Sequence, residues 1–113
     1  MIEIRRIQTI LERHGDHFLG RVYTHAELAY AKGRASALAT RWAAKEATAK
    51  ALGTGIGAVN FQDIEVVCDP QGKPELLLHG KAARLAVQLQ LNQFALSLSH
   101  TAEYALAFVV AQG

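Results

Sequence analysis

The sequence contains almost no cysteine, which excludes a disulfide-stapled fold. Cys68 is the single cysteine among 113 residues, so it has no partner for a disulfide within the chain. It lies in a strand-like run, where a buried thiol without a chemical role is the ordinary interpretation. A chain without internal disulfides fits a reducing compartment, and we expect a cytoplasmic protein.

Long apolar runs are also missing. No stretch approaches the ~20 apolar residues that a membrane-spanning helix needs. The N-terminus carries Glu3, Arg5 and Arg6 where a signal peptide would have an apolar region. We therefore expect neither a membrane segment nor a signal peptide.

Charged and aromatic residues are too few for a nucleic-acid-binding surface. They make up 19% and 7% of the chain, and the net charge is only +2. Proteins that bind nucleic acids cluster Lys and Arg and offer aromatic side chains on which bases stack, and this chain does neither. Half of the residues are hydrophobic, which at this length predicts one domain with a proper core.

The clearest helix signal runs over residues 35–52, which are rich in Ala, Lys and Glu and contain no Gly or Pro. Gly53 stands where a left-handed residue would end this helix. Trp42, Glu46 and Lys50 recur every four residues and therefore share one face. A solvated Glu–Lys pair worth ~0.3–0.5 kcal/mol is the common explanation of such spacing. A functional pair is the alternative.

The first segment, residues 1–18, has apolar residues at helical spacing and is interrupted by Gly15. Arg6 and Arg13 are seven residues apart and share a face, and Arg21 follows after the break. Together the three arginines could form a basic strip. An ordinary solvated helix face is the alternative.

Thr24 and Glu27 have the spacing of a capping box, which predicts the start of a short helix. Residues 32–34, Lys-Gly-Arg, form a basic break before the main helix. This break is either a plain loop or a contact for phosphate, since Lys and Arg are the usual partners of polyanionic ligands.

The second half of the chain reads as strands with one helix between them. The turn at residues 69–74 contains both prolines and joins two strands of a hairpin. The expected elements are strands at 61–68, 75–79, 94–99 and 104–111, and a helix at 80–91. Because strands and helices do not alternate regularly, we expect an α+β fold with a mainly antiparallel sheet.

The order of residues on the main helix carries a resemblance to a known family. An aromatic residue, Lys-Glu, a second Lys four residues after the Glu, and a Gly-rich turn resemble the W/F-x-x-K-E-x-x-x-K signature of the 4′-phosphopantetheinyl transferases. Residues 52–55, Leu-Gly-Thr-Gly, and 97–101, Ser-Leu-Ser-His-Thr, are similar to the small holo-acyl-carrier-protein synthases of that superfamily. The resemblance extends over nearly the whole chain.

The resemblance implies a transferase that moves the phosphopantetheine arm of coenzyme A to a serine of apo-acyl carrier protein. It implies Mg²⁺ as the cofactor, adenosine 3′,5′-bisphosphate as the released product, and a homotrimer with active sites between subunits. A remnant of the same fold that binds coenzyme A or a nucleotide and transfers little is the alternative. Neither hypothesis includes nucleic acid or a membrane as a partner.

The resemblance also implies roles for individual residues. Glu46 would bind Mg²⁺ and assist catalysis, and Lys50 would serve catalysis at the departing phosphate. Lys45, the other lysine of the motif, would contact a neighbouring phosphate or have a structural role, and a catalytic role is equally consistent with the motif. The implied cofactor-binding residues are Lys45, Gly53, Thr54, Gly55, Ser99, His100 and Thr101. The implied docking residues for an acidic helix of the carrier protein are Arg6, Arg13 and Arg21.

The sequence departs from the family pattern at its N-terminus. Family members usually begin with a short strand whose Asp is the second protein ligand of Mg²⁺, and Met1 matches the position after that Asp. We therefore expect the first strand and the second ligand to be missing. A misassigned start or a shortened chain is one explanation. The alternatives are a substitute carboxylate from Glu3, which matches a different family position, and a chain that really lacks the second carboxylate.

Overall fold

A computed structural model describes residues 1–53 and 59–113. In chain order the elements are β1 (Ile2–Glu3), α1 (Ile4–Val22), α2 (His25–Ala31), α3 (Ala35–Ala51), the short 3-10 helix η1 (Phe61–Asp63), β2 (Ile64–Cys68), β3 (Pro74–Leu78), α4 (Gly80–Gln88), β4 (Gln93–His100) and β5 (Tyr104–Gln112). Both sheets are antiparallel, which confirms the expected α+β class.

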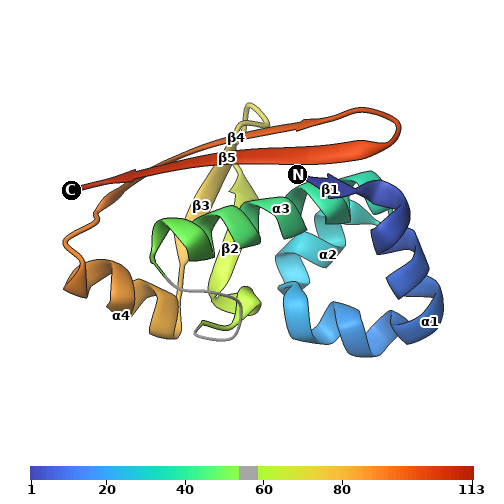
Figure 1. The fold of residues 1–113 in the computed structure, drawn as a ribbon, viewed down its shortest axis with the longest axis horizontal. Coiled ribbons are helices and arrows are strands. Elements are labelled where there is room, and N and C mark those ends of the chain that lie inside the picture. The colour runs from blue at the N-terminus through green and yellow to red at the C-terminus, as the bar shows by residue number, and fades with distance from the viewer. Residues whose placement is uncertain (54–58) are drawn as a thin grey trace.

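Helix α3 lies in the middle of the molecule. The β4–β5 hairpin runs along one side of it, while α1 and α2 gather near its N-terminal end (Figure 1). Its small Ala side chains allow these neighbours to approach closely, and Leu38, Ala39 and Ala44 are almost completely buried. The helix ends as predicted, since Gly53 adopts the left-handed φ of 74° and its N–H donates to the Lys50 carbonyl at 2.9 Å.

The larger sheet has the strand order β1–β5–β4, so β5 is its central strand. Ile2 and Glu3 pair with Ala105 and Tyr104. This pairing corrects the expectation that the first strand is missing, because the chain forms a two-residue strand on the edge of β5 that β4 leaves free.

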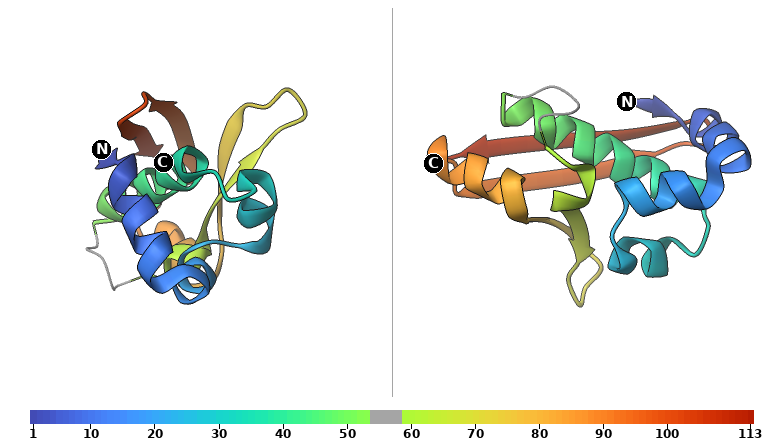
Figure 2. Two further views of the ribbon diagram at one scale, coloured as in Figure 1. Left: turned by 90° about the vertical axis from the view of Figure 1, so that its right-hand side faces the viewer. Right: turned by 90° about the horizontal axis from the view of Figure 1, so that it is seen from below.

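The smaller sheet is the predicted β2–β3 hairpin, whose turn projects away from the rest of the molecule (Figure 2). Strand β2 begins at Ile64, three residues later than expected, because Phe61–Asp63 form the 3-10 turn in which the Asp63 N–H donates to the Asn60 carbonyl. Helix α4 ends at Gln88, before the expected residue 91. The strands predicted at 94–99 and 104–111 are confirmed as β4 and β5, each slightly longer.

Helix α1 is bent at Gly15, whose φ of 26° and ψ of −111° lie outside the helical region. A residue with a Cβ rarely adopts this backbone conformation, which explains the glycine. The kink separates Arg6 and Arg13 from Arg21. The predicted interruption is confirmed, but the chain returns to helix and continues to Val22.

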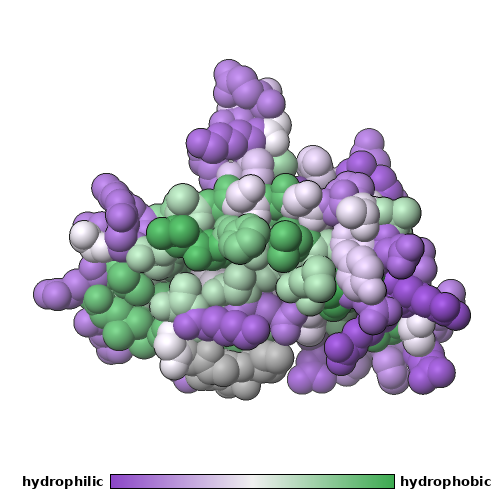
Figure 3. All heavy atoms as spheres, turned by 45° about the horizontal axis from the view of Figure 1, so that its top comes forward, coloured by the Kyte–Doolittle hydropathy of each residue, from purple (hydrophilic) through white to green (hydrophobic). Residues whose placement is uncertain are grey.

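The outward face of the β4–β5 hairpin is apolar along β5, while the exposed residues of β4 are small or polar. Its largest exposed apolar side chains come from β5: Tyr104 is 40% exposed, Phe108 66% and Val110 60%. They alternate with Ala105, which is fully buried on the side of α3. Figure 3 shows apolar residues gathered along this side of the molecule. In the described ranges no helix is long and apolar enough to cross a membrane.

Candidate active site

The predicted catalytic carboxylate, Glu46, lies on α3 in a hollow of about 320 Å³. Trp42, one turn earlier on the same face, forms part of its wall. The N-terminal segment supplies Glu3 and Arg6, and Tyr104 comes from β5. The structure therefore brings Glu46 together with a second carboxylate and an arginine from the start of the chain. Sequence reasoning had placed Arg6 in the docking strip alone.

The donor set of this hollow fits Mg²⁺. Glu3 and Glu46 offer carboxylate oxygens, and Mg²⁺ is usually held by one or two carboxylates together with water and substrate phosphates. A denser group of three or more His, Cys, Asp or Glu residues suited to a metal does not occur among residues 1–53 and 59–113. The hollow is therefore suited to a metal that shares its coordination with a ligand.

Lys45 has a different environment from its neighbour Glu46. Its side chain is fully buried, and its Nζ lies 2.8 Å from Glu27 Oε1 and 2.8 Å from the Phe61 carbonyl oxygen. It also donates to the Ile64 carbonyl. Burial lowers the pKa of Lys45, and the negative charge of Glu27 opposes that shift. All of these partners are internal, which favours the structural alternative for Lys45 over contact with a phosphate.

Glu27 completes this buried cluster. The predicted capping box is confirmed: the Thr24 N–H donates to Glu27 Oε1 at 3.0 Å, and the Glu27 N–H donates to Thr24 Oγ1 at 3.2 Å. Glu27 Oε2 in addition accepts from the Val66 N–H at 3.0 Å. The carboxylate thus joins α2, α3 and β2, and it fixes the rotation of α3 immediately beside Glu46.

The Gly-rich turn after α3 is only partly described. Gly53 is exposed, and its N–H is already used by the Lys50 carbonyl. Thr54 and Gly55, both predicted to contact the cofactor, lie outside the described residues. Lys50 is exposed in the last turn of α3, one turn beyond Glu46.

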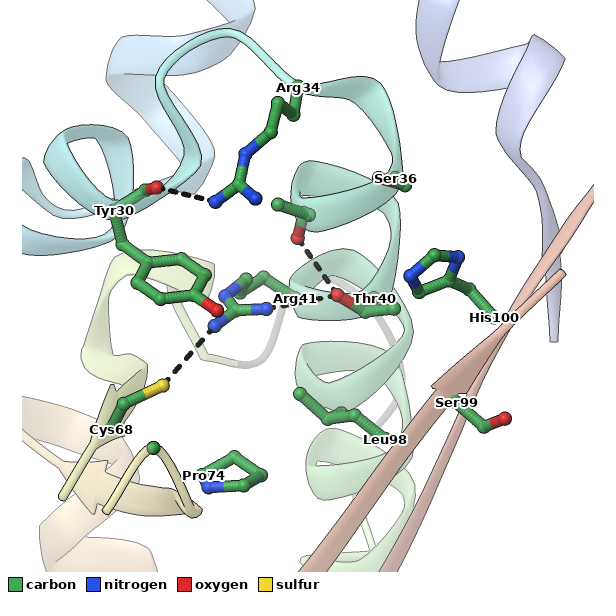
Figure 4. Close-up of a pocket in the computed structure, with 12 residues that line it drawn as sticks. Tyr30, Arg34, Ser36, Thr40, Arg41, Cys68, Pro74, Leu98, Ser99 and His100 are labelled. Carbon is green, nitrogen blue, oxygen red and sulfur yellow. Dashed lines mark hydrogen bonds between the residues drawn. The ribbon is translucent and has the colours of Figure 1, made fainter. Parts of the chain in front are cut away.

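The predicted Ser-His-Thr segment lies at the other end of α3. Ser99 and His100 end β4 and line a cavity of about 230 Å³, together with Arg34, Thr40 and Arg41 (Figure 4). His100 and Thr101 also line an adjoining, more open hollow of about 670 Å³ beside the first residues of α3. Two arginines, a histidine and the positive end of a helix make this region suitable for a phosphate group.

Sequence reasoning missed two residues of this cavity, Tyr30 and Arg41. The Arg41 guanidinium carbon lies 4.3 Å from the centre of the Tyr30 ring, and that of Arg34 lies 5.2 Å from it. Arg34 also donates hydrogen bonds to the Tyr30 and Ala31 carbonyls, and these bonds cap the C-terminal end of α2. The seven-residue spacing of Arg34 and Arg41 was the available signal, because it places them on one face.

The three docking arginines do not lie in one straight row. Arg6 lines the Glu46 hollow, whereas Arg21 lines a separate hollow of about 390 Å³ on the other side of Trp42. Arg21 lies near His17, with 3.4 Å between Nη1 and Nε2. Arg13 is exposed on α1. The docking role of the three residues stays a prediction.

Comparisons with known proteins agree with this arrangement. Residues 1–109 match the model of the 4′-phosphopantetheinyl transferase superfamily. A holo-acyl-carrier-protein synthase of Koribacter versatilis is 46% identical, over 97% of this chain and 91% of the relative. Another, from Herpetosiphon aurantiacus, is 47% identical over 100% of this chain and 94% of the relative.

Solved structures give the same result. The holo-acyl-carrier-protein synthase of Helicobacter pylori in complex with coenzyme A superposes with a TM-score of 0.89 at 31% identity, covering 98% of this chain and 95% of the other. The holo-acyl-carrier-protein synthase of Neisseria meningitidis superposes with a TM-score of 0.88 at 39% identity. The match covers 99% of this chain and 93% of the other. The chain therefore belongs to the 4′-phosphopantetheinyl transferase superfamily and, within it, to the holo-acyl-carrier-protein synthase family of enzymes.

Proposed function

We propose that this chain transfers the 4′-phosphopantetheine group of coenzyme A to a serine of apo-acyl carrier protein in a Mg²⁺-dependent reaction. The observation that carries the proposal is the pairing of Glu46 with Glu3 and Arg6 in one hollow, on the helix that bears the family signature. The second support is the cationic cavity at the N-terminal end of the same helix. The Helicobacter pylori relative forms a complex with coenzyme A.

The reaction makes one bond and breaks one bond. The serine oxygen of the carrier forms a bond to the β-phosphorus of coenzyme A, and the bond from that phosphorus to the bridging oxygen breaks. The electron pair leaves with adenosine 3′,5′-bisphosphate. Glu46 would hold Mg²⁺, which would supply positive charge beside the pyrophosphate.

Residues of the chain would accept the proton, neutralise the departing phosphate and hold the nucleotide. Glu46 would accept the proton of the serine hydroxyl, directly or through water. Lys50, one turn further along α3, would neutralise the departing phosphate. Arg34, Arg41 and His100 would hold the phosphates of the nucleotide end of coenzyme A.

We further propose a homotrimer whose active sites lie between subunits. In the part of the chain that the structure describes, the Glu46 hollow and the Arg41 cavity have no lining residue in common. In the proposed trimer, a ligand would contact the Glu46 hollow of one copy and the Arg41 cavity of another. The outward apolar face around Phe108 and Val110 is a suitable surface for such contacts, because burying it removes apolar area from water.

The experiment is an intact-mass assay. Apo-acyl carrier protein is incubated with the enzyme, coenzyme A and MgCl₂, with a parallel reaction in EDTA. We expect the carrier to gain one phosphopantetheine with Mg²⁺ and none with EDTA. Glu46→Gln should abolish the gain while the far-ultraviolet circular dichroism stays that of the wild type.

The matched control is Glu75→Gln, which makes the same change at an exposed carboxylate on β3. It should transfer at the wild-type rate. Full activity of Glu46→Gln would refute the assigned role of Glu46. Coenzyme A binding without any product from the wild type would support the alternative of a binding remnant.

A further inference from the structure

The cavity that contains Arg41 holds a buried cation without a negative partner. Arg41 is only 5% exposed, and within the described residues it forms no ion pair with a carboxylate. Its Nη1 donates to Thr40 Oγ1 at 3.1 Å, and among residues 1–53 and 59–113 its Nε has no hydrogen-bond partner. A buried charge of this kind is costly unless an anion reaches it, so the cavity is built for an anionic group.

Besides its stacking on the Tyr30 ring, Arg41 forms a second hydrogen bond, with the single cysteine of the chain. Nη2 donates to Cys68 Sγ at 3.6 Å, and Figure 4 shows the thiol beside the guanidinium in the wall of the cavity. Cys68 is the last residue of β2, where it pairs with Pro74, and it is half-buried. The sequence had suggested a buried thiol without a role. In the structure, however, it lies next to a buried cation in the wall of an open cavity.

We propose that Cys68 is an oxidation-sensitive modification site whose sulfinate form occupies Arg41 and weakens the binding of phosphate in this cavity. Hydrogen peroxide first converts the thiol to a sulfenic acid and releases water. A second peroxide adds another oxygen to give the sulfinic acid, again with release of water. The sulfinic acid then loses a proton to solvent.

The product places a full negative charge within reach of the guanidinium. The sulfinate oxygens accept hydrogen bonds from Arg41, so the buried cation gains an internal partner. A phosphate that enters the cavity then meets a like charge and loses its own partner. Negative charge on the sulfinate therefore disfavours the binding of an anion in this cavity.

This inference rests on the proposed function for the identity of the ligand, which is the adenosine 3′,5′-bisphosphate part of coenzyme A. The test measures binding of adenosine 3′,5′-bisphosphate by calorimetry before and after treatment with hydrogen peroxide. Intact mass and peptide mapping record the addition of two oxygen atoms to Cys68. We expect binding to weaken by at least about tenfold in the oxidised protein, since like charges at this separation interact strongly.

Two variants make the test specific. Cys68→Ser cannot form a sulfinate, so its affinity should be the same before and after peroxide. Cys68→Asp carries a permanent carboxylate at the same place and should bind weakly without peroxide. Because the sulfinic acid is not reduced by simple thiols, dithiothreitol should not restore the affinity of the oxidised wild type.

The outcomes separate the two proposals. Unchanged affinity in protein whose Cys68 is fully oxidised would overturn the Cys68 proposal and leave the proposed function intact. An equal loss of affinity in peroxide-treated Cys68→Ser would also overturn it, because another residue would then be responsible. Failure of the untreated protein to bind the nucleotide would overturn the placement of phosphate in this cavity, and the Cys68 proposal with it.

Discussion

At the scale of single residues, the ion pair of Lys45 and Glu27 is fully buried and should contribute to stability. Lys45→Met leaves the Glu27 carboxylate buried without its cation, and breaking a buried pair in this way typically costs about 3–5 kcal/mol. We expect this loss in the free energy of unfolding measured by urea titration. Lys50 is exposed on the same helix, so Lys50→Met should lower the free energy of unfolding far less.

A second substitution tests the cause of that loss. Adding Glu27→Gln to Lys45→Met removes the unpaired charge while it keeps an acceptor for the Val66 N–H. We expect part of the stability to return. If Lys45→Met were no less stable than Lys50→Met, the ion pair would have no structural role, and the assignment of Lys45 as a ligand-binding residue would regain support.

Glu65 makes stability depend on pH. Burial acts to raise its pKa, but hydrogen bonds from Thr24 and His79 and the positive charges of His79 and Lys45 outweigh burial. The pKa in the folded chain therefore lies below its ordinary 4.5. The unfolded chain then binds more protons between the two values, so this stabilisation is complete above pH 4.5 and is lost as the pH falls through the folded-state pKa.

Thermal unfolding of the wild type and His79→Ala, followed between about pH 3 and pH 6, tests this assignment. Without His79 the pKa of Glu65 should move up toward its ordinary value, so the variant should gain less stability than the wild type as the pH rises. Glu65→Gln, which cannot titrate, should show the smallest pH dependence of the three. Parallel curves for all three proteins would contradict the assignment.

At the scale of elements, the kink of α1 determines which arginines can act together. Arg13 is exposed before Gly15, and Arg21 follows the bend. Arg13→Glu should raise the KM for apo-acyl carrier protein several-fold, because it replaces an attractive charge with a repulsive one. The dissociation constant for coenzyme A should stay unchanged. Arg84→Glu, the same change on the exposed side of α4, is the matched control.

Steady-state kinetics with varied carrier concentration and calorimetry with coenzyme A separate these effects. An equal loss of carrier and coenzyme A binding in Arg13→Glu would contradict the docking strip. A rise in KM as large in Arg84→Glu would show that net charge alone is responsible.

The elements themselves differ in how well the sequence predicts them. Helix α3 was predicted nearly to the residue because its helix formers end at a glycine that only the left-handed region accommodates comfortably. The start of β2 was predicted too early, because the apolar Phe61 suits a strand as well as the 3-10 turn that it joins. Local sequence patterns predict helix interiors and turns better than they predict strand boundaries.

The site was predictable only where its residues share one local motif. Glu46 was predicted from the W/F-x-x-K-E-x-x-x-K family signature on α3, and its catalytic role stays a prediction. The burial of Lys45 could not be predicted from the motif, because its partner Glu27 is 18 residues away on another element. Arg41 was missed for the same reason: its cavity forms only when β2, β4 and α3 come together.

At the scale of the whole molecule, the proposed homotrimer can be tested through the two separate hollows. The Glu46 hollow and the Arg41 cavity are lined by different described residues of one chain. If a complete site takes Glu46 from one copy and Arg41 from another, Glu46→Gln and Arg41→Ala should each be nearly inactive alone. Mixed oligomers made by co-expression should regain activity, because some sites receive neither substitution.

Random mixing in equal amounts leaves about one quarter of such shared sites intact, so we expect recovery of roughly that fraction of the wild-type rate. Adding Phe108→Glu to both chains should abolish the recovery and lower the mass measured by sedimentation, because a charge then lies in the apolar contact face. Val87→Glu, a similar change at an exposed apolar residue of α4, should affect neither. Mixed oligomers without any recovered activity would show that each chain carries a complete site, and the apolar face around Phe108 would then serve assembly alone.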